Sequence, residues 1–323
     1  MKHVRRNILI YIVVLMMAAA GITGCGRDND AVITEGPDTL AKPGSSTQEE
    51  EPGGSEAGTG AGQDTAAAVT ATGSSADKTL TITALKGGAA DAFVLMTDDH
   101  VTLIDTGLDK KADKLVDFLH EQGVTRIDEI IITHFDKDHV GGADHILAEF
   151  EVGSVYTTYR SKDSDDITSY TQALITAGLT ETVVKEITTL QAGGVTFTIY
   201  PPQALVYADD VSNNSSLVIK VSVGENSMLF AGDAEFERIR ELLATPGLES
   251  VILKVPHHGR IAANSREFIE YISPEYAIIT SSNSEPEDQE VLDILDSLGV
   301  ATYLTKNGNV TVTMTASEVS VTQ

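Results

Sequence analysis

The chain has 323 residues and a formal net charge of −26, with 22 lysines and arginines against 48 aspartates and glutamates. This acidity argues against a general nucleic-acid or anionic-membrane binder, because both need a positive field. The single cysteine excludes a disulfide framework or a cysteine-rich zinc module, whereas 41% hydrophobic residues suffice for a folded core.

The N-terminus has the pattern of an export signal. Three basic residues precede the 13 consecutive apolar residues 8–20, which are fewer than the about 20 that a membrane-spanning helix needs. The next residues, Ile22-Thr23-Gly24-Cys25, resemble the lipobox of bacterial lipoproteins, in which the cysteine is lipidated. We therefore expect 1–24 to be a signal peptide and the protein to be extracytoplasmic, lipid-anchored to the cell membrane through Cys25. An uncleaved signal anchor with an incidental cysteine is the alternative.

A linker and then one domain are expected after the signal. Residues 25–77 are mostly small or acidic and include no aromatic residue. Such a composition buries too little apolar surface to offset the chain entropy lost on folding, so it predicts a disordered linker that begins with the lipidated cysteine. Residues 78–323 are long enough for one large domain.

Hydrophobic periodicity predicts an α/β domain. In its first half we expect strands at 79–85, 92–97, 101–105, 127–133 and 152–157, with helices at 110–121, 143–150 and 167–177. In its second half we expect strands at 195–200, 216–223, 227–231, 251–255, 276–280, 302–304, 310–314 and 319–321, with helices at 235–243, 266–272 and 287–298. Alternating strands and helices in both halves favour two sheets packed back to back with helices outside.

Metal-binding side chains gather directly after the strand at 127–133. His134, Asp136, Asp138 and His139 lie within six residues and are followed by two glycines. Adjacent carboxylates repel one another and raise each other's pKa, and a cation reverses that cost. A tight loop of this kind suits two cations about 4 Å apart. The alternative is a solvated acidic turn that happens to contain two histidines.

This loop resembles the HxHxDH signature of the metallo-β-lactamase fold, with Asp136 where the second histidine usually stands. The resemblance implies a four-layer αββα sandwich. Three further segments match it, at 101–107, 229–235 and 253–259. In the family they deliver an aspartate that supports the ligands (here Asp105), a metal-bridging aspartate (Asp233) and a last histidine (His257 or His258).

The details resemble the hydrolase domain of ComEC-type DNA-internalisation proteins. The matching residues are T-H-x-D-x-D-H-x-G-G, N-N-x-S-L-V, G-D-A-E and L-K-V-P-H-H-G, which together span 78–323. The resemblance implies that one metal is held by Asp138, His139, Asp233 and His257 or His258. The other would be held by His134 and Asp136, with Asp233 bridging.

The second metal position is expected to be rich in oxygen, because the chain has no histidine between His145 and His257. Oxygen ligands favour Mn²⁺ or Mg²⁺ in relative terms. We therefore expect a centre of two divalent metal ions, Zn²⁺ or Mn²⁺.

Other polar residues have two interpretations each. Asp105 either supports a ligand or ends a strand, and Asn213 and Asn214 either line the substrate site or form a turn. Lys254 faces either an anionic substrate or solvent. His145 is expected to be structural, since it lies in a predicted helix.

The expected reaction is hydrolysis by a metal-activated water that Asp138 orients. His258, where it is not a ligand, would protonate the leaving group. The ComEC-like details favour a phosphodiester, with a small phosphodiester, an oligonucleotide or a phosphorylated surface molecule as substrate. Tight duplex DNA binding is not expected, because the domain is acidic and its longest basic run is Lys110-Lys111. The alternatives are an amide or ester hydrolase, including β-lactam hydrolysis, and a non-catalytic metal-binding surface lipoprotein.

Overall fold

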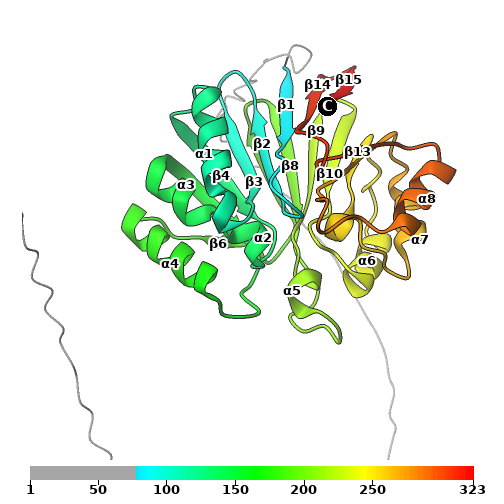
Figure 1. Ribbon diagram of the computed structural model, residues 1–323, viewed down its shortest axis with the longest axis horizontal. Helices are drawn as coiled ribbons and strands as arrows, with labels where there is room; N and C mark the ends of the chain where they lie inside the picture. Colours follow the sequence, from blue (N-terminus) through cyan, green and yellow to red (C-terminus); the bar gives the residue numbers. More distant parts are fainter. Residues whose placement is uncertain (1–77) are drawn as a thin grey trace, which may run out of the picture. The chain divides into compact units, whose positions relative to one another are not determined.

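The computed structural model describes residues 78–323, and these form two β-sheets packed face to face (Figure 1). The expected signal peptide, Cys25 and the linker lie outside the described residues. Among the helices that residues 78–323 form, none has both the length and the apolar character needed to span a membrane.

The first sheet has eight strands in the order β15-β14-β1-β2-β3-β4-β5-β6. Pairing is antiparallel from β15 to β3 and parallel from β3 to β6. The C-terminal hairpin thus joins the N-terminal strand. The strands are β1 (Leu80–Ala84), β2 (Ala92–Met96), β3 (Val101–Thr106), β4 (Arg126–Ile132), β5 (Glu151–Thr157), β6 (Thr182–Val183), β14 (Val310–Met314) and β15 (Val319–Thr322).

The second sheet has seven strands in the order β13-β12-β11-β10-β9-β8-β7. Pairing is antiparallel from β7 to β10 and parallel from β10 to β13. The strands are β7 (Thr188–Ala192), β8 (Val195–Tyr200), β9 (Val218–Val223), β10 (Asn226–Phe230), β11 (Ile252–Lys254), β12 (Tyr276–Ile279) and β13 (Ala301–Leu304).

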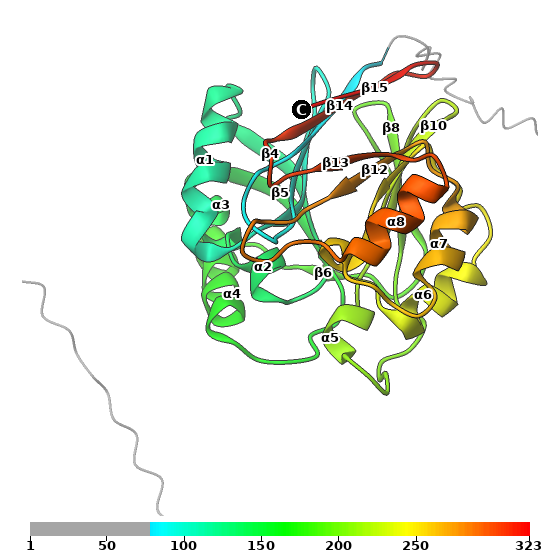
Figure 2. The same cartoon turned by 45° about the vertical axis from the view of Figure 1, so that its right-hand side comes forward.

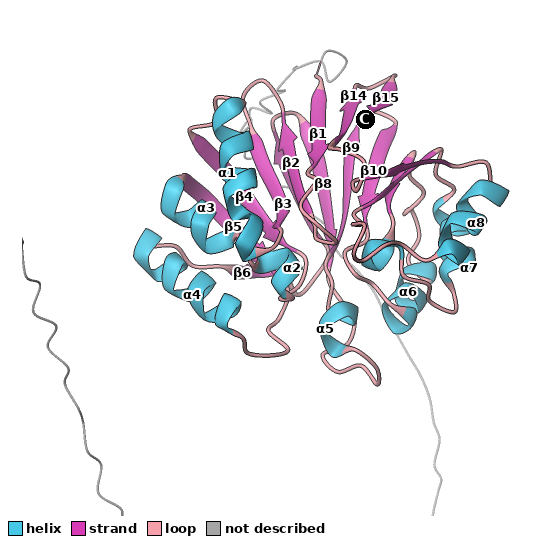
Figure 3. Cartoon of the chain, viewed as in Figure 1, coloured by secondary structure: helices cyan, strands magenta, loops and turns pink. Residues whose placement is uncertain are grey.

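Helices cover the outer face of each sheet (Figure 3). The first sheet carries α1 (Ala112–Glu121), α3 (Ala143–Glu149) and α4 (Asp165–Ala177), and the second carries α6 (Phe236–Leu243), α7 (Ser265–Ile272) and α8 (Gln289–Ser297). Short helical turns lie in the connections at one edge: η2 (Asp109–Lys111), α2 (Lys137–Val140), α5 (Val211–Asn214) and η3 (Pro256–Gly259).

Three hydrophobic cores hold the layers together. Between the sheets, Phe93 of β2 meets Phe230 of β10 edge to face, with ring centroids 5.0 Å apart. Leu103 and Leu115 belong to the core under the first set of helices, and Leu253 and Phe268 to the core under the second. The four-layer αββα sandwich expected from the sequence is therefore confirmed.

Two strands were not predicted, and both are short or polar. β6 has only two residues, and β7 (Thr-Thr-Leu-Gln-Ala) is a half-exposed edge strand without an apolar run. Periodicity alone does not distinguish such segments from loops.

Candidate metal centre

The candidate metal centre forms where β4, β10 and β11 end. The connection after β4 runs through His134 into α2, that after β10 carries Asp233, and β11 leads into η3. Ile130, Ile131 and Ile132 are buried, so the strand that leads into the first connection is fixed in the core. The packing of the two sheets thereby brings together residues as far apart in the chain as Asp138 and His258.

Two glycines let the first connection pack closely against β3. A Cβ on Gly141 would lie 2.6 Å from the backbone nitrogen of Asp109, and one on Gly142 would lie 2.5 Å from the carbonyl oxygen of Thr106. Both residues have negative φ angles. They are therefore needed for the close approach of the backbone and not for a left-handed turn.

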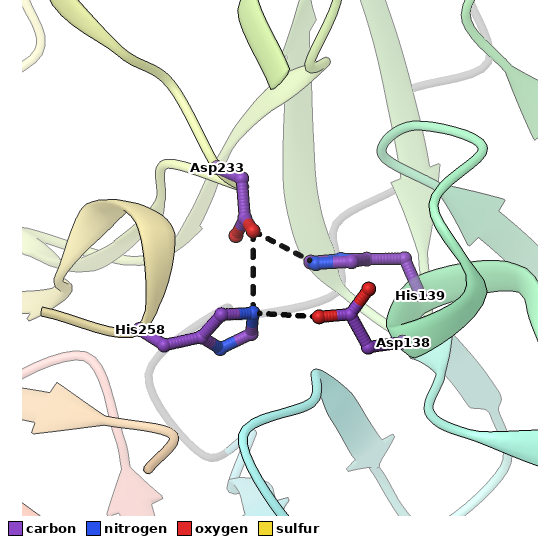
Figure 4. A group of neighbouring side chains, drawn as sticks. All are labelled: Asp138, His139, Asp233 and His258. Carbon is purple, nitrogen blue, oxygen red and sulfur yellow. Dashed lines mark hydrogen bonds and ion pairs between the residues drawn. The ribbon is translucent and has the colours of Figure 1, made fainter. Parts of the chain in front are cut away.

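Four side chains converge at the centre: Asp138, His139, Asp233 and His258 (Figure 4). Asp233 Oδ2 lies 3.2 Å from the Nε2 atoms of both His139 and His258, and His258 Nε2 lies 3.2 Å from Asp138 Oδ2. One donor atom from each residue lies within 4.8 Å of the others. Two carboxylate oxygens and two imidazole nitrogens make a suitable donor set for a divalent metal ion.

Asp105 orients His139 from behind. Its Oδ2 lies 2.8 Å from His139 Nδ1, and it accepts hydrogen bonds from the backbone nitrogen and the hydroxyl of Thr133, at 2.7 and 2.6 Å. Asp105 has a left-handed backbone, with φ of 57°. The carboxylate therefore occupies Nδ1 and leaves Nε2 directed at the cluster, as in supported metal-binding histidines.

His134 and Asp136 lie beside these four residues. His134 Nε2 is buried, lies 3.9 Å from Asp136 Oδ1 and has no hydrogen-bond partner among the described residues. Its ring centroid is 4.0 Å from that of His139. Burial, together with neighbouring His139, lowers the pKa of His134 from 6.5 to about 4, so the ring is neutral at neutral pH. A neutral, unpartnered imidazole nitrogen is what a second metal ion requires.

Asp136 has two further partners. Its Oδ1 contacts the hydroxyl of Ser212 and the ammonium of Lys162. Burial would raise the pKa of Asp136, but its interactions with His134 and Lys162 outweigh that effect and lower the pKa.

Charge pairing dominates the four-residue cluster. Burial opposes a charge on His258, but Asp233 and Asp138 outweigh it and raise the pKa of His258 to about 9. Burial would likewise raise the pKa of the Asp138 and Asp233 carboxyls, but the neighbouring histidines hold both well below their usual range. The carboxylates thus remain ionised and able to bind a cation.

Lys254 takes a different position from the one expected. It is fully buried, and its Nζ lies 2.6 Å from Asp91 Oδ2, 3.2 Å from Asp233 Oδ1 and 2.7 Å from the carbonyl oxygen of Gly232. It therefore contacts neither substrate nor solvent. Its charge is held where it neutralises Asp91 and Asp233, so Lys254 positions a candidate ligand.

Asp91 is a functional residue that sequence reasoning missed. Besides Lys254 it accepts a hydrogen bond from Thr280 Oγ1 at 2.6 Å, and Thr280 Oγ1 in turn lies 2.9 Å from His258 Nδ1. Asp91 therefore supports His258 through Thr280, whereas Asp105 supports His139 by direct contact. The available signal was weak, namely one acid immediately before a strand and after the turn Gly87-Gly88-Ala89-Ala90.

The adjacent histidines point in different directions. Both are left-handed, with φ of 47° at His257 and 52° at His258. His258 enters the cluster with 6% of its side chain exposed, whereas His257 is 31% exposed and its Nδ1 lies 2.9 Å from Glu235 Oε1. The sequence left the choice between His257 and His258 open; the structure brings His258, and not His257, to the other donors.

The two asparagines also differ. Asn213 Nδ2 donates to Glu235 Oε1 at 3.0 Å and lies 3.5 Å from His257 Nε2, so it belongs to the rim of the centre. Asn214 is buried and accepts from the backbone nitrogen of Arg238 at 2.9 Å, which holds the start of α6. The expected substrate contact of Asn214 is therefore corrected to a structural one. His145 pairs with Asp109 on the surface, away from the cluster.

Comparisons with known proteins agree with this geometry. A model of the metallo-beta-lactamase superfamily matches residues 85–281, more than half of the chain. The chain is 31% identical to ComE operon protein 3 of Bacillus subtilis over 204 residues, which is 61% of the chain and 26% of that protein. It is 28% identical to Recombination protein 2 of Haemophilus influenzae and 27% identical to Competence protein ComA of Neisseria gonorrhoeae, with 62% of the chain covered in each case.

The chain spans about a quarter of the length of these relatives, 24% and 27% for the last two. The resemblance to competence proteins expected from the sequence is confirmed. Among solved structures, the metallo-beta-lactamase fold protein YhfI of Bacillus subtilis matches with a TM-score of 0.50 and 10% identity, covering 75% of this chain and all of that one. This match concerns the fold alone.

Proposed function

Since the chain belongs to the metallo-β-lactamase superfamily, we propose that it is a metal-dependent phosphodiesterase that works outside the cytoplasm, tethered by a lipid on Cys25. Metallo-hydrolase chemistry in general follows from the family and from the donor cluster. The phosphodiester substrate, the identity of the metal and the lipid anchor are the parts that we propose.

The residues present fit two divalent ions. Asp138, His139, Asp233 and His258 would hold one, and His134 and Asp136 would contribute ligands to the other. The buried Nε2 of His134 has no hydrogen-bond partner among residues 78–323, and the Nε2 of His139 has only its 3.2 Å ion-pair contact with Asp233 Oδ2. A metal ion would satisfy both nitrogens. When bound, such ions activate a water as nucleophile and polarise the scissile group. The oxygen of Asp136 in place of a nitrogen supports Mn²⁺ alongside Zn²⁺.

The chain's own residues would do the following. Asp138 is the most exposed of the four clustered side chains, at 23%, so it can accept a hydrogen bond from the attacking water and orient it. Asp91 and Asp105 hold the Nδ1 sides of His258 and His139 through the contacts described above. His257 lies at the rim with Glu235, where it can contact the leaving group. This contact replaces the protonating role first considered for His258.

The single observation that carries the phosphodiester proposal is the oxygen-rich loop, in which Asp136 and Asp138 flank Lys137. The names of two of the relatives, which refer to recombination and competence, give the proposal further support. Hydrolysis of amides or esters remains the second candidate, because the same family match accommodates it.

The test compares substrates on one preparation of the full chain. We expect bis(p-nitrophenyl) phosphate to be hydrolysed with Mn²⁺ or Zn²⁺ and not with chelator, and a chromogenic β-lactam to be left intact. Asp138→Asn should lower kcat by at least about 100-fold, which is the lower end of the effect of a positioned catalytic group. Asp109→Asn, a surface change, is the matched control. Turnover of the β-lactam alone would contradict the proposal.

The anchor is tested separately, by expressing the gene in a bacterium and separating membranes from soluble protein. We expect the wild-type chain in the membrane fraction and Cys25→Ser in the soluble or unprocessed fraction. Equal membrane association of both would contradict lipidation at Cys25.

A further inference from the structure

A groove lined by five lysines shares two loops with the residues that support the candidate metal centre. The lysines come from three separate parts of the chain: Lys86 after β1, Lys110, Lys111 and Lys114 in η2 and α1, and Lys306 after β13. The groove has a volume of about 300 Å³. A positive surface is unexpected in a protein of net charge −26, and Lys110-Lys111 are the only two of its five lysines that are adjacent in the sequence.

Most of this positive charge is free to bind a ligand. Lys86, Lys110, Lys111 and Lys114 are exposed, and within the part of the chain that the structure describes none of them forms an ion pair. Lys306 is paired with Glu287, and Glu285 is the one acidic residue that lines the groove. Asp109, beside Lys110, is turned toward His145 instead.

The groove is lined by residues that neighbour, in the chain, the two residues that support His258. Gly87 and Gly88 line it and lead directly into Asp91, and Ser281 lines it next to Thr280. Asp91 and Thr280 are the pair that holds His258. The loop that follows β12 therefore contributes both to the groove, through Ser281, and to the support of His258, through Thr280. Figure 2 shows the backbone of this loop between β12 and α8.

The remaining lining is suited to phosphate oxygens rather than to bases. Ser281, Ser282, Asn283 and Ser284 supply hydroxyl and amide donors, which commonly contact phosphate and sugar. No aromatic side chain lines the groove, so it offers no platform on which bases stack. Lysine ammonium groups bind phosphates as point charges and carry no base preference.

We propose that this lysine groove binds the phosphodiester backbone of a single-stranded nucleic acid that extends from the bond cut at the metal centre. The inference rests on the proposed function and names its substrate class. A volume at the lower end of small-ligand pockets suits a few nucleotides of one strand. The local positive charge of the groove also answers the objection that a protein of strongly negative net charge should not bind nucleic acid, because binding depends on the charge at the binding surface.

The first test measures binding of a fluorescent oligothymidylate to the full chain by anisotropy at several salt concentrations, with chelator present to prevent cleavage. Lys110→Gln/Lys114→Gln removes two groove charges, and Lys78→Gln/Lys185→Gln removes two charges elsewhere. For the groove variant we expect Kd to rise about tenfold at low salt. The negative slope of log K against log salt should become shallower by about 1.4. The control should match the wild type.

Three results would overturn the groove: no binding by the wild type, equal loss in both variants, or binding that disappears with an abasic oligomer of the same length. The proposed function fails differently. Bis(p-nitrophenyl) phosphate is too small to reach the groove from the metal centre. The kcat/KM for its hydrolysis should therefore be equal in the wild type and the groove variant. Binding that depends on the lysines, without such hydrolysis, would contradict the proposed phosphodiesterase and support the groove. Hydrolysis together with binding that does not depend on the lysines would support the phosphodiesterase and contradict the groove.

Discussion

His257 and His258 are neighbours in the chain but have different surroundings. Left-handed backbone at both residues turns one ring to Glu235 at the rim and the other to Asp138 and Asp233. For a non-glycine residue this conformation costs about 1–2 kcal/mol, and such strain clusters at functional sites. The division of roles is thus built into the backbone of η3.

Substitution of each histidine separates binding from turnover. His258→Ala removes a donor from the cluster, so we expect loss of about one metal ion per chain and of all hydrolysis. His257→Ala leaves the donors intact, so metal content should stay at the wild-type value while kcat falls. Metal analysis after dialysis, with kinetics on the same samples, measures both. Loss of metal from the His257 variant with retention by the His258 variant would reverse the assignment.

Lys254 offers a second test at the residue scale. Lys254→Met keeps the volume of the side chain and leaves two buried carboxylates, Asp91 and Asp233, without their shared cation. Breaking a buried charge network in this way costs about 3–5 kcal/mol. Urea denaturation of the apo-protein should show this loss, while exposed Lys185→Met should stay within about 0.5 kcal/mol of wild type. A neutral effect of Lys254→Met would mean that the two carboxylates do not depend on it.

At the scale of elements, the connections at the carboxyl ends of the strands carry the chemistry, while the strands fix their positions. The connection from β12 to α8 is a good example, because Thr280 serves the metal centre and Ser281 to Glu285 line the lysine groove. It is held to the turn after β13 by the contact of Glu287 with Lys306. Burial would raise the pKa of Glu287, but the hydrogen bond from Lys306 outweighs it and lowers the pKa below 4.5.

This contact predicts a pH dependence of stability. Because folding lowers the pKa of Glu287, the unfolded chain binds more protons, and stability rises with pH through the acid range. The contribution is complete above the unfolded pKa near 4.5 and is lost as pH falls through the lower folded value. We expect Glu287→Gln to flatten the change in urea midpoint between about pH 5 and pH 3 in apo-protein. An unchanged slope would show that the pair does not contribute.

At the scale of the whole molecule, two sheets pack face to face, and the candidate site at one edge of the sandwich draws on both. Asp138 and His139 come from the first half of the chain, and Asp233 and His258 come from the second. Neither half contains a complete donor set, so the site exists only when the sandwich is assembled. Metal binding should therefore stabilise the assembled fold.

Much of this architecture follows from the sequence, because a buried strand such as β4 has an apolar run that leads into candidate metal ligands. Short polar β6 and β7 lack such runs, and Asp91 is a lone acid whose partners are distant in the chain. The choice between His257 and His258 depends on backbone angles that no periodicity encodes. The lysine groove could not be predicted from the sequence for a similar reason, since only two of its five lysines are adjacent in the chain.

The most direct measurement is a titration of metal-free protein with Mn²⁺ and, separately, Zn²⁺, while bound metal and hydrolysis of bis(p-nitrophenyl) phosphate are followed together. The donor arrangement predicts that turnover rises with occupancy and reaches its plateau at two ions per chain, with Asp233→Asn failing to reach it. A maximum of one ion per chain, or two bound ions without turnover, would contradict a dinuclear phosphodiesterase.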